Sequence, residues 1–362
     1  MPAIFVYFIL LNILLLAAFI VRKQKESLIT NPLLWFAIII VSLIVGLRWD
    51  PENEDFLNYF SLAAGDLPEF ALDRIEIIPR YLVLILNYFK MPSFLWFFLM
   101  ALVQLLFIVL TANNGKKQIL PWMFLLYFYS LFSLSLIITR QLAALMVILY
   151  AYSYIEKRKF GSYLFFVALA YCFHRTALIC IPLYWLPNLI KFESRTWQIL
   201  IICGFLLFGD YLIASFWSLI PIDQEVFRYA KYVDREFEYG AKTGLGVISN
   251  YLRYFIIVLF SNKLKKSFDK GFSIYYSLLF VQICLYKCMM NDLAFSRAIM
   301  YFSIADLVVS GFLIHYLLNS KNRSDKIINL LVVSVLFVTI FYSAYNSPDW
   351  SFVWNAHLPI RN

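Results

Sequence analysis

Six basic residues at the ends of apolar segments are the side chains of this sequence best suited to chemistry. They are Arg48, Arg140, Arg175, Arg253, Lys287 and Arg297. A charge near mid-bilayer costs roughly 2.5 to 3.5 kcal/mol, so such groups should pair with one another or line a polar cavity. Each one alone could reach the lipid headgroups along its flexible stem. Together, at one level of several helices, they indicate a polyanion site, because arginine can grip phosphate oxygens with paired hydrogen bonds.

One histidine lies beside this basic group. His174 falls in "YCFHRTAL", a short turn between two apolar segments, next to Arg175. A neutral imidazole there could act as a general base near pH 7, and it could equally be a structural hydrogen-bonding residue. No second histidine, cysteine or carboxylate stands at ligand spacing, so the sequence predicts neither a metal site nor a cofactor.

An acidic segment, "GLRWDPENEDFLNYF" at residues 46–60, follows the second apolar segment. If a helix begins near Pro51, then Asp55, Asn58 and Tyr59 share one face at spacings of three and four residues. Such a face could hold a sugar through hydrogen bonds and ring stacking. The alternative is a solvated acidic helix start, whose carboxylates favour the positive end of the helix dipole.

The elements that must position these residues are membrane helices. Hydrophobic residues make up 62% of the 362 residues and charged residues 15%, which excludes a soluble or disordered chain. The formal charge of +9 does not indicate nucleic-acid binding, because the basic residues form short clusters between apolar runs. Twelve spans are predicted near residues 3–21, 33–47, 93–111, 119–135, 140–155, 161–173, 175–189, 197–219, 245–261, 272–290, 297–317 and 328–345.

Charged residues in the loops predict the orientation. The loops after odd-numbered spans hold 17 basic and five acidic residues, so they should be cytoplasmic, with both termini on the outer side. We expect a single transmembrane domain over residues 1–362, with outer segments at 48–92 and 220–244 and an outer tail at 346–362. Within the first, "RIEIIPRYLVLILNYFK" suits a helix that lies at the membrane interface.

Several of these blocks, in this order, resemble one known family. They are "GLR" with "DFLNYF", then "ITRQLAALMVILYAYSYIEKRKF", then "ALAYCFHRTALICIPLYWL", and they cover roughly residues 40–190. They resemble the EpsG-like group of Wzy-type polysaccharide polymerases, which includes many O-antigen polymerases. The most specific part is residues 138–186, where an Arg-Gln pair, a basic turn and a Phe-His pair follow one another.

The resemblance implies an all-α, polytopic membrane enzyme similar to metal-independent GT-C-type glycosyltransferases. It would act at the outer, periplasmic face of the bacterial inner membrane and need no cofactor. Its substrate would be an undecaprenyl-pyrophosphate-linked oligosaccharide, whose glycan is transferred to a sugar hydroxyl of a new repeat unit. The partners implied are membrane lipids and the chain-length regulator, flippase and ligase of the same pathway, but no nucleic acid.

The chemistry of the residues and the family resemblance together predict a role for each candidate residue. His174 is the first choice of general base and Asp55 the second, while Arg48 orients the acidic loop and Tyr59 contacts the acceptor sugar. The expected pyrophosphate ligands are Arg140, Arg175, Arg253 and Arg297. A transporter or flippase of lipid-linked glycans would place such charges on both membrane faces, whereas a membrane acyltransferase would need a histidine near a carboxylate in a funnel.

Overall fold

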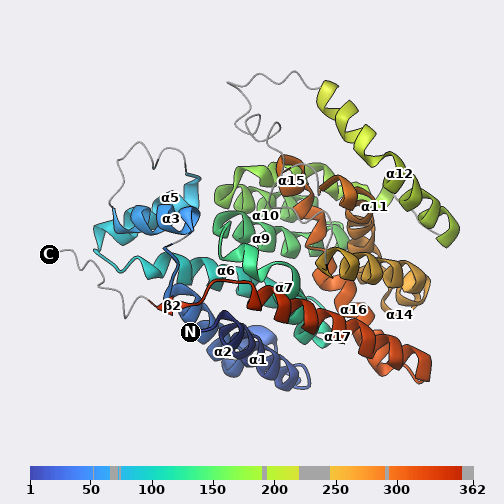
Figure 1. The fold of residues 1–362 in the computed structure, drawn as a ribbon, viewed down its shortest axis with the longest axis horizontal. Coiled ribbons are helices and arrows are strands. Elements are labelled where there is room, and N and C mark those ends of the chain that lie inside the picture. The colour runs from blue at the N-terminus through green and yellow to red at the C-terminus, as the bar shows by residue number, and fades with distance from the viewer. Residues whose placement is uncertain are drawn as a thin grey trace.

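The computed structural model describes residues 1–51, 53–65, 72, 75–189, 194–219, 245–289 and 293–352. The second predicted outer segment, 220–244, lies outside the described residues, as do the last part of the tail and the side chain of Lys287. The described part is almost wholly helical (Figure 1). An all-α membrane protein therefore fits the predicted fold class.

The helices follow the apolar segments of the sequence closely. The first half holds α1 (Ala3–Val21), η1 (Leu28–Thr30), α2 (Pro32–Gly46), α3 (Glu54–Ala64), α5 (Ile77–Tyr88), α6 (Phe94–Asn113), η2 (Lys117–Ile119), α7 (Leu120–Ser130), α8 (Phe132–Ser135) and α9 (Thr139–Glu156). The second half holds α10 (Phe160–Phe173), η3 (Arg175–Tyr184), α11 (Leu186–Leu189), α12 (Arg195–Leu219), α14 (Leu245–Met289), α15 (Leu293–Ser303), α16 (Asp306–Asn319) and α17 (Arg323–Tyr345).

Four stretches of the described residues are long and apolar enough to cross a membrane. They are Ala3–Val21, Phe94–Asn113, Ser296–Asn319 and Arg323–Tyr345. Several further apolar helices are shorter, with 10 to 17 residues. The predicted number of twelve spans stays a prediction.

The helices also agree with the predicted reversal of the chain between residues 261 and 272. Leu245–Met289 carries one label, α14, but its two halves lie side by side, because Asn250 Nδ2 donates to the Tyr286 hydroxyl at 2.9 Å and the Tyr254 ring lies 5.6 Å from the Tyr286 ring. Positions 250 and 286 of a straight helix would be about 54 Å apart, so the two halves correspond to the segments predicted at 245–261 and 272–290. The segment predicted at 297–317 is instead divided into α15 and α16, and Asp306 opens the second helix, where its charge suits the helix dipole.

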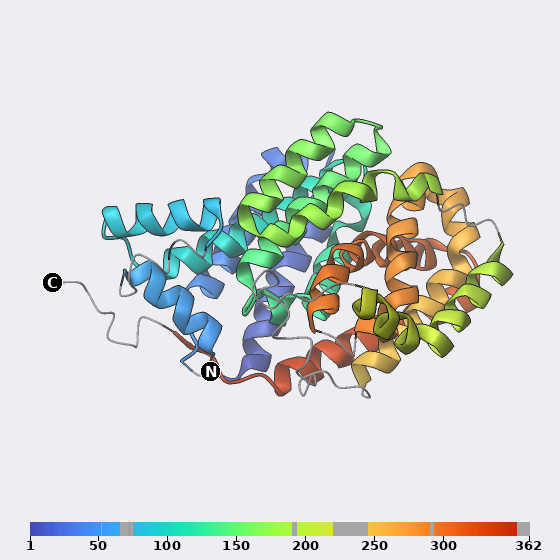
Figure 2. The same ribbon diagram turned by 90° about the horizontal axis from the view of Figure 1, so that it is seen from above.

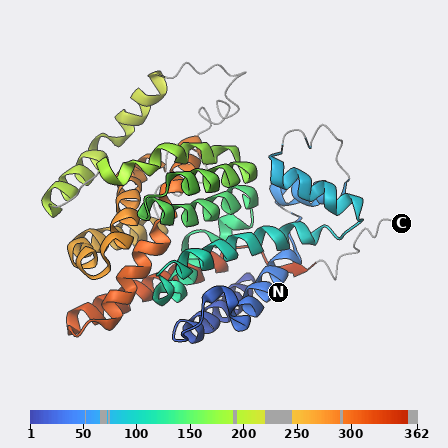
Figure 3. The same cartoon turned by 180° about the vertical axis from the view of Figure 1, so that it is seen from behind.

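The N-terminus and the segment after α17 are joined at one end of the molecule. The Met1 amino group donates to the Trp350 carbonyl oxygen, and the Trp350 N–H donates to the Met1 carbonyl oxygen, each at 2.8 Å. Beside them, β1 (Arg48–Trp49) and β2 (Ser351–Phe352) pair in antiparallel fashion. Helices α3 and α5 lie at this same end, while α12 lies toward the opposite side (Figures 1 and 3).

The basic loops that were predicted to be cytoplasmic also contact one another. The Lys117 ammonium donates to the carbonyl oxygens of Gln24 and Glu26, and Lys116 pairs with Glu156 at 3.0 Å. The inner loops predicted after the first, third and fifth spans thus share one surface, which agrees with the predicted alternation.

Helix α9 lies in the core and positions the candidate site at its N-terminal end. It packs against α6, α10, α14 and η3, and the view from above shows α9 and α10 between the blue N-terminal helices and the orange α14 (Figure 2). Most α9 side chains are buried around its whole circumference, as expected for a helix enclosed by other helices. The first turn of α9 is therefore held rigidly at the end of the bundle.

Candidate active site

A buried ion pair between Arg140 and Glu76 is the centre of the candidate site. Arg140, in the first turn of α9, pairs through Nη1 with the Glu76 carboxylate, and its Nε donates to the Tyr59 hydroxyl at 3.2 Å. The Arg140 side chain is 21% exposed and the Glu76 side chain 9%. One guanidinium therefore joins α9 to α3 and to the residue that precedes α5.

Glu76 was not among the predicted site residues. Besides Arg140, its carboxylate accepts a hydrogen bond from the Arg175 backbone N–H at 3.4 Å through Oε1. Glu76 occupies the N-cap position of α5 but makes no side-chain bond to that helix. The signal available in the sequence was a lone carboxylate inside the apolar stretch "RIEIIPR", where burial without a partner would be costly.

His174 ends α10 and lies within the electrostatic reach of this pair. Its Nδ1 hydrogen-bonds the Thr176 hydroxyl at 2.7 Å, and that hydroxyl is 2.9 Å from the Tyr301 hydroxyl. Burial lowers the pKa of His174 to about 4, opposed by the nearby Glu76 carboxylate and reinforced by the charges of Arg140, Arg297 and Arg175. The imidazole is therefore neutral at pH 7.

Three of the four predicted pyrophosphate arginines thus gather around one histidine. Arg140 is mostly buried, the Arg175 side chain is exposed, and Arg297 is partly buried. The Arg297 carbonyl oxygen accepts a hydrogen bond from Gln141 Nε2 at 3.0 Å, which ties α15 to α9 next to Arg140. The structure brings Tyr59 into the same group, but it does so through Arg140.

A groove opens beside the ion pair, between α5 and the turn that holds His174. Its volume is about 430 Å³, and Glu76 lies in its wall. The other lining residues are Ile75, Ile77, Arg80, Tyr81, Leu84, Tyr171 and Arg175. Arg80 was not singled out from the sequence, although it lies within the quoted α5 segment. The groove thus combines two arginines with an apolar wall, which suits an anionic lipid headgroup.

The helix α5 that forms this wall is amphipathic. Its exposed apolar side chains are Ile77, Tyr81, Leu84, Ile85 and Tyr88, and the first three also line the groove. On the opposite side, Val83 and Leu86 are fully buried. At 12 residues the helix is too short to cross a bilayer, so its form agrees with the predicted interfacial helix.

The other predicted residues of the acidic segment lie apart from this group. Arg48 is buried and binds Asp50 at 3.0 Å and the Leu136 carbonyl oxygen at 2.9 Å, so it connects β1 to the segment before α9. The helix α3 begins at Glu54 rather than near Pro51, and the Asn53 side chain caps it by accepting from the Phe56 N–H. Asp55 is exposed on α3, whereas Tyr59 is buried against Arg140, so the two do not form one open face.

Arg253 belongs to a second polar cluster, between α14 and α16. Its guanidinium pairs with Asp306 and also donates to the Ser310 hydroxyl at 2.8 Å and to Asn250 Oδ1 at 2.6 Å. The side chain is 3% exposed. Asp306 neutralises this arginine between α14 and α16, apart from the contacts that join Arg140, Glu76 and Tyr59, and its role as a pyrophosphate ligand stays a prediction.

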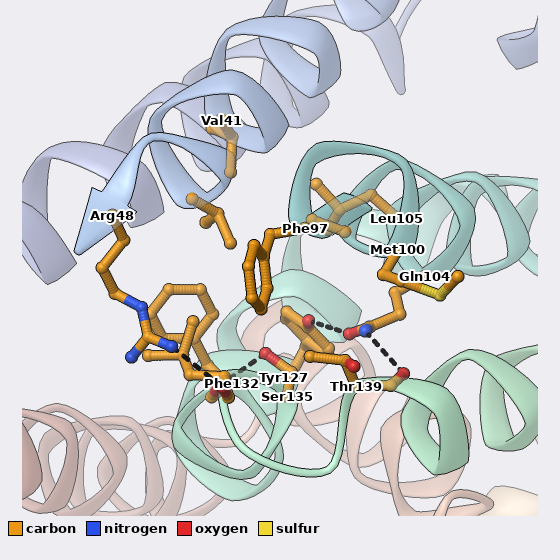
Figure 4. A pocket seen from close by; sticks show the side chains of 13 residues that line it. Val41, Arg48, Phe97, Met100, Gln104, Leu105, Tyr127, Phe132, Ser135 and Thr139 are labelled. Atoms are coloured by element: carbon orange, nitrogen blue, oxygen red, sulfur yellow. Dashed lines mark hydrogen bonds between the residues drawn. The ribbon is translucent and has the colours of Figure 1, made fainter. Parts of the chain in front are cut away.

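Packing behind the site fixes the start of α9. Tyr127 donates to Gln104 Oε1 at 2.7 Å, and Gln104 Nε2 donates to the Thr139 carbonyl oxygen at 3.5 Å (Figure 4). These three residues line a small cavity of about 10 Å³, and Arg48 lines it as well (Figure 4). The residue directly before Arg140 is thereby tied to α6 and α7.

Together the fold and the site define an α-helical membrane protein with a cationic polar site at one end of its bundle. The chain belongs to the EpsG family, whose family model matches residues 31–358. This membership indicates a membrane protein of polysaccharide biosynthesis with a polymerase-like role. No curated protein and no solved structure matches the chain.

Proposed function

We propose that the chain is a polymerase that joins undecaprenyl-pyrophosphate-linked oligosaccharide repeat units into O-antigen or a related surface polysaccharide. The observation that carries the proposal is the Glu76–Arg140 ion pair beside a neutral His174, at a groove with two further arginines. The enzyme would be a GT-C-like glycosyltransferase with about twelve spans. Its site would face the periplasm from the inner membrane, where chain-length regulator, flippase and ligase would be its partners.

The arginines would stabilise the leaving group. Transfer of the glycan breaks the bond between the first sugar carbon and the pyrophosphate, which leaves with the bonding electrons. Arg140, Arg175 and Arg297 carry the positive charge near His174, and Arg80 extends it along the groove. Guanidinium groups that are already in place can stabilise the developing charge without a metal ion.

His174 would take the proton from the attacking sugar hydroxyl. If Nδ1–H donates to Thr176, then Nε2 keeps its lone pair and can accept that proton. The low pKa keeps the imidazole unprotonated, and the Glu76 carboxylate stabilises the imidazolium that forms. Asp55, which was the second choice of base, is exposed on α3 and would need the substrate to reach it there.

A membrane acyltransferase is the second candidate function. The observation that favours it is Glu76, because a histidine near a buried carboxylate is the arrangement that acyl transfer to a hydroxyl would use. The arginine-lined groove favours the pyrophosphate-linked substrate instead.

Deletion of the gene tests the proposal. We expect the surface polysaccharide to change from a ladder of lengths to single repeat units, and the wild-type gene to restore the ladder. Arg140→Ala should fail to restore it while inserting normally into the membrane. The matched control, Arg323→Ala, removes an exposed arginine at the start of α17 and should restore it. A normal ladder in the deletion strain would exclude the polymerase, and altered acylation of the glycan would favour the second candidate.

A further inference from the structure

A second pocket lies at the end of the bundle where β1 meets β2. Its volume is about 120 Å³. The lining residues are Tyr7, Arg48, Trp49, Asp50, Asn53, Ser133, Leu136, Ile137, Ser347, Pro348, Asp349 and Trp350. They come from both ends of the chain and from the segment before α9. The proposed reaction leaves this pocket unused.

Polar groups of several kinds line it. The Asn53 Oδ1 atom is occupied as the cap of α3, accepting from the Phe56 N–H at 3.1 Å, whereas no described residue binds its Nδ2. The Asp349 carboxylate is exposed and also has no partner among the described residues. Asp50 is 9% exposed and is held by Arg48. One amide and two carboxylates can together bind the vicinal hydroxyls of a sugar.

Aromatic rings supply the second requirement of sugar binding. The Trp49 ring is partly exposed and is fixed by edge-on contacts with Phe56 and Phe60, at centroid distances of 5.8 and 5.0 Å. Tyr7 and Trp350 contact each other edge-on at 6.3 Å but are buried, with 1% and 4% exposed, so Trp49 is the indole that a ligand can reach. An indole offers a flat apolar face with a polar edge, so it suits the C–H face of a pyranose ring.

The pocket is held in shape by contacts that are remote in sequence. The two hydrogen bonds between Met1 and Trp350, the β1–β2 pairing and the Arg48 bond to Leu136 all fix its walls. A preformed site loses little conformational freedom on binding, which raises affinity.

The charges of the pocket favour a neutral ligand. Arg48 is already neutralised by Asp50, and Asp349 adds a negative charge that disfavours an anion. A calcium ion would need six to eight oxygen ligands, and one of the two carboxylates is engaged by arginine. A single uncharged sugar ring fits both the groups and the volume.

We propose that this pocket binds one neutral sugar residue of the glycan and so keeps the growing chain attached to the enzyme. This role rests on the proposed function. The pocket lies at the same end of the bundle as the candidate active site, because its lining residue Leu136 precedes Arg140 by only four positions in the chain. A glycan held here has a higher effective concentration at the reacting centre, which favours repeated transfer.

Binding of simple glycosides tests the pocket without any reaction. The probes are the methyl glycosides of glucose, galactose and N-acetylglucosamine, with methyl glucuronide as the charged comparison. Purified protein in a detergent that contains no sugar is examined by saturation-transfer NMR. We expect transfer to at least one neutral glycoside, and at least fivefold less in Asp349→Ala and in Asn53→Asp. The second variant keeps the α3 cap but loses the amide donor.

The matched control is Asn346→Ala, which lies next to the pocket without lining it and should bind as the wild type does. Failure of every neutral glycoside to bind, binding as strong as in the wild type by both pocket variants, or a preference for the glucuronide would each overturn the proposal. In cells, the pocket variants should shift the polysaccharide to shorter lengths. Glycoside binding by a protein that makes no polymer would instead contradict the proposed function and leave the sugar site standing.

Discussion

At the scale of single residues, Glu76 connects the groups that the sequence predicts separately. Its carboxylate contacts both the Arg140 side chain and the Arg175 backbone, and it offsets the effect of three arginines on the pKa of His174. Arg140, His174 and Arg175 were among the predicted residues because they lie at the predicted outer ends of their segments. Glu76 was not, because a lone carboxylate in an apolar stretch signals only that a partner is needed, and its partner Arg140 is 64 positions away.

Replacing Glu76 tests its place in the site. Glu76→Gln keeps the size of the side chain but leaves Arg140 without its counter-charge and His174 without the carboxylate that would stabilise its protonated form. We expect polymer formation to fall by about 100-fold or more, with a larger effect on kcat than on KM. The matched control is Glu26→Gln, which changes an exposed carboxylate and should retain full activity in the same membrane assay. Normal activity of Glu76→Gln would remove this residue from the site.

The depressed pKa of His174 has a consequence for stability. Because the folded protein holds the imidazole neutral down to a pKa of about 4 and the unfolded chain protonates it near 6.5, folding is favoured above pH 6.5. That contribution is lost as the pH falls from 6.5 toward 4. Relative to His174→Gln, the wild type should therefore lose more of its Tm over this window in detergent melts. If the Tm of the wild type instead rose relative to that of His174→Gln as the pH falls, the burial of a neutral imidazole would be contradicted.

At the scale of elements, close packing of α2 on α6 supports the end of the bundle where β1 begins. A Cβ atom on Gly46 would lie 2.8 Å from the Phe98 Cβ atom and 3.0 Å from the Phe94 carbonyl oxygen. Gly46→Ala should therefore destabilise the protein by about 1 to 3 kcal/mol. Gly161→Ala is the matched control, since a Cβ atom there meets nothing within 4 Å. A thermal melt in which both variants behave alike would show that α2 and α6 are less closely packed.

The ion pair between α14 and α16 makes a different prediction. Asp306→Asn leaves the buried Arg253 uncompensated and should destabilise the protein by about 3 to 5 kcal/mol. In the double variant Arg253→Met with Asp306→Leu, an apolar pair of similar size should recover much of that loss. If Arg253 is purely structural, polymer formation should recover with stability. A stable but inactive double variant would instead support the role that the sequence predicted for Arg253 in binding pyrophosphate.

The same elements show where sequence patterns reach their limit. The ends of α1, α2, α9 and α10 agree with the predicted segments to within about one residue, because apolar runs end where charges begin. The chain also reverses between the segments predicted at 245–261 and 272–290, because Asn250 Nδ2 and the Tyr286 hydroxyl are 2.9 Å apart. The division of the segment predicted at 297–317 into α15 and α16 was not predicted, because hydropathy alone does not reveal a break inside an apolar run.

At the scale of the whole molecule, the two ends of the bundle differ in character. One end gathers lysines of successive predicted inner loops, whereas the other holds the Met1–Trp350 pair, the Glu76–Arg140 pair and the pocket beside β1 and β2. The basic residues could predict which loops lie together. Consecutive membrane helices run in opposite directions, so every second loop lies on the same side. The pairing of Met1 with Trp350 could not be predicted, because no local pattern relates residues 349 positions apart.

The most direct test of the account is polymerisation by the purified protein. Liposomes that contain the wild type and a single undecaprenyl-pyrophosphate-linked repeat unit should yield a ladder of longer lipid-linked glycans and free undecaprenyl pyrophosphate, with a metal chelator present throughout. Arg140→Ala in matched liposomes should lower this yield by about 100-fold or more, because it removes a donor to the leaving group. A normal ladder from Arg140→Ala, or loss of the wild-type ladder on chelation, would contradict the account.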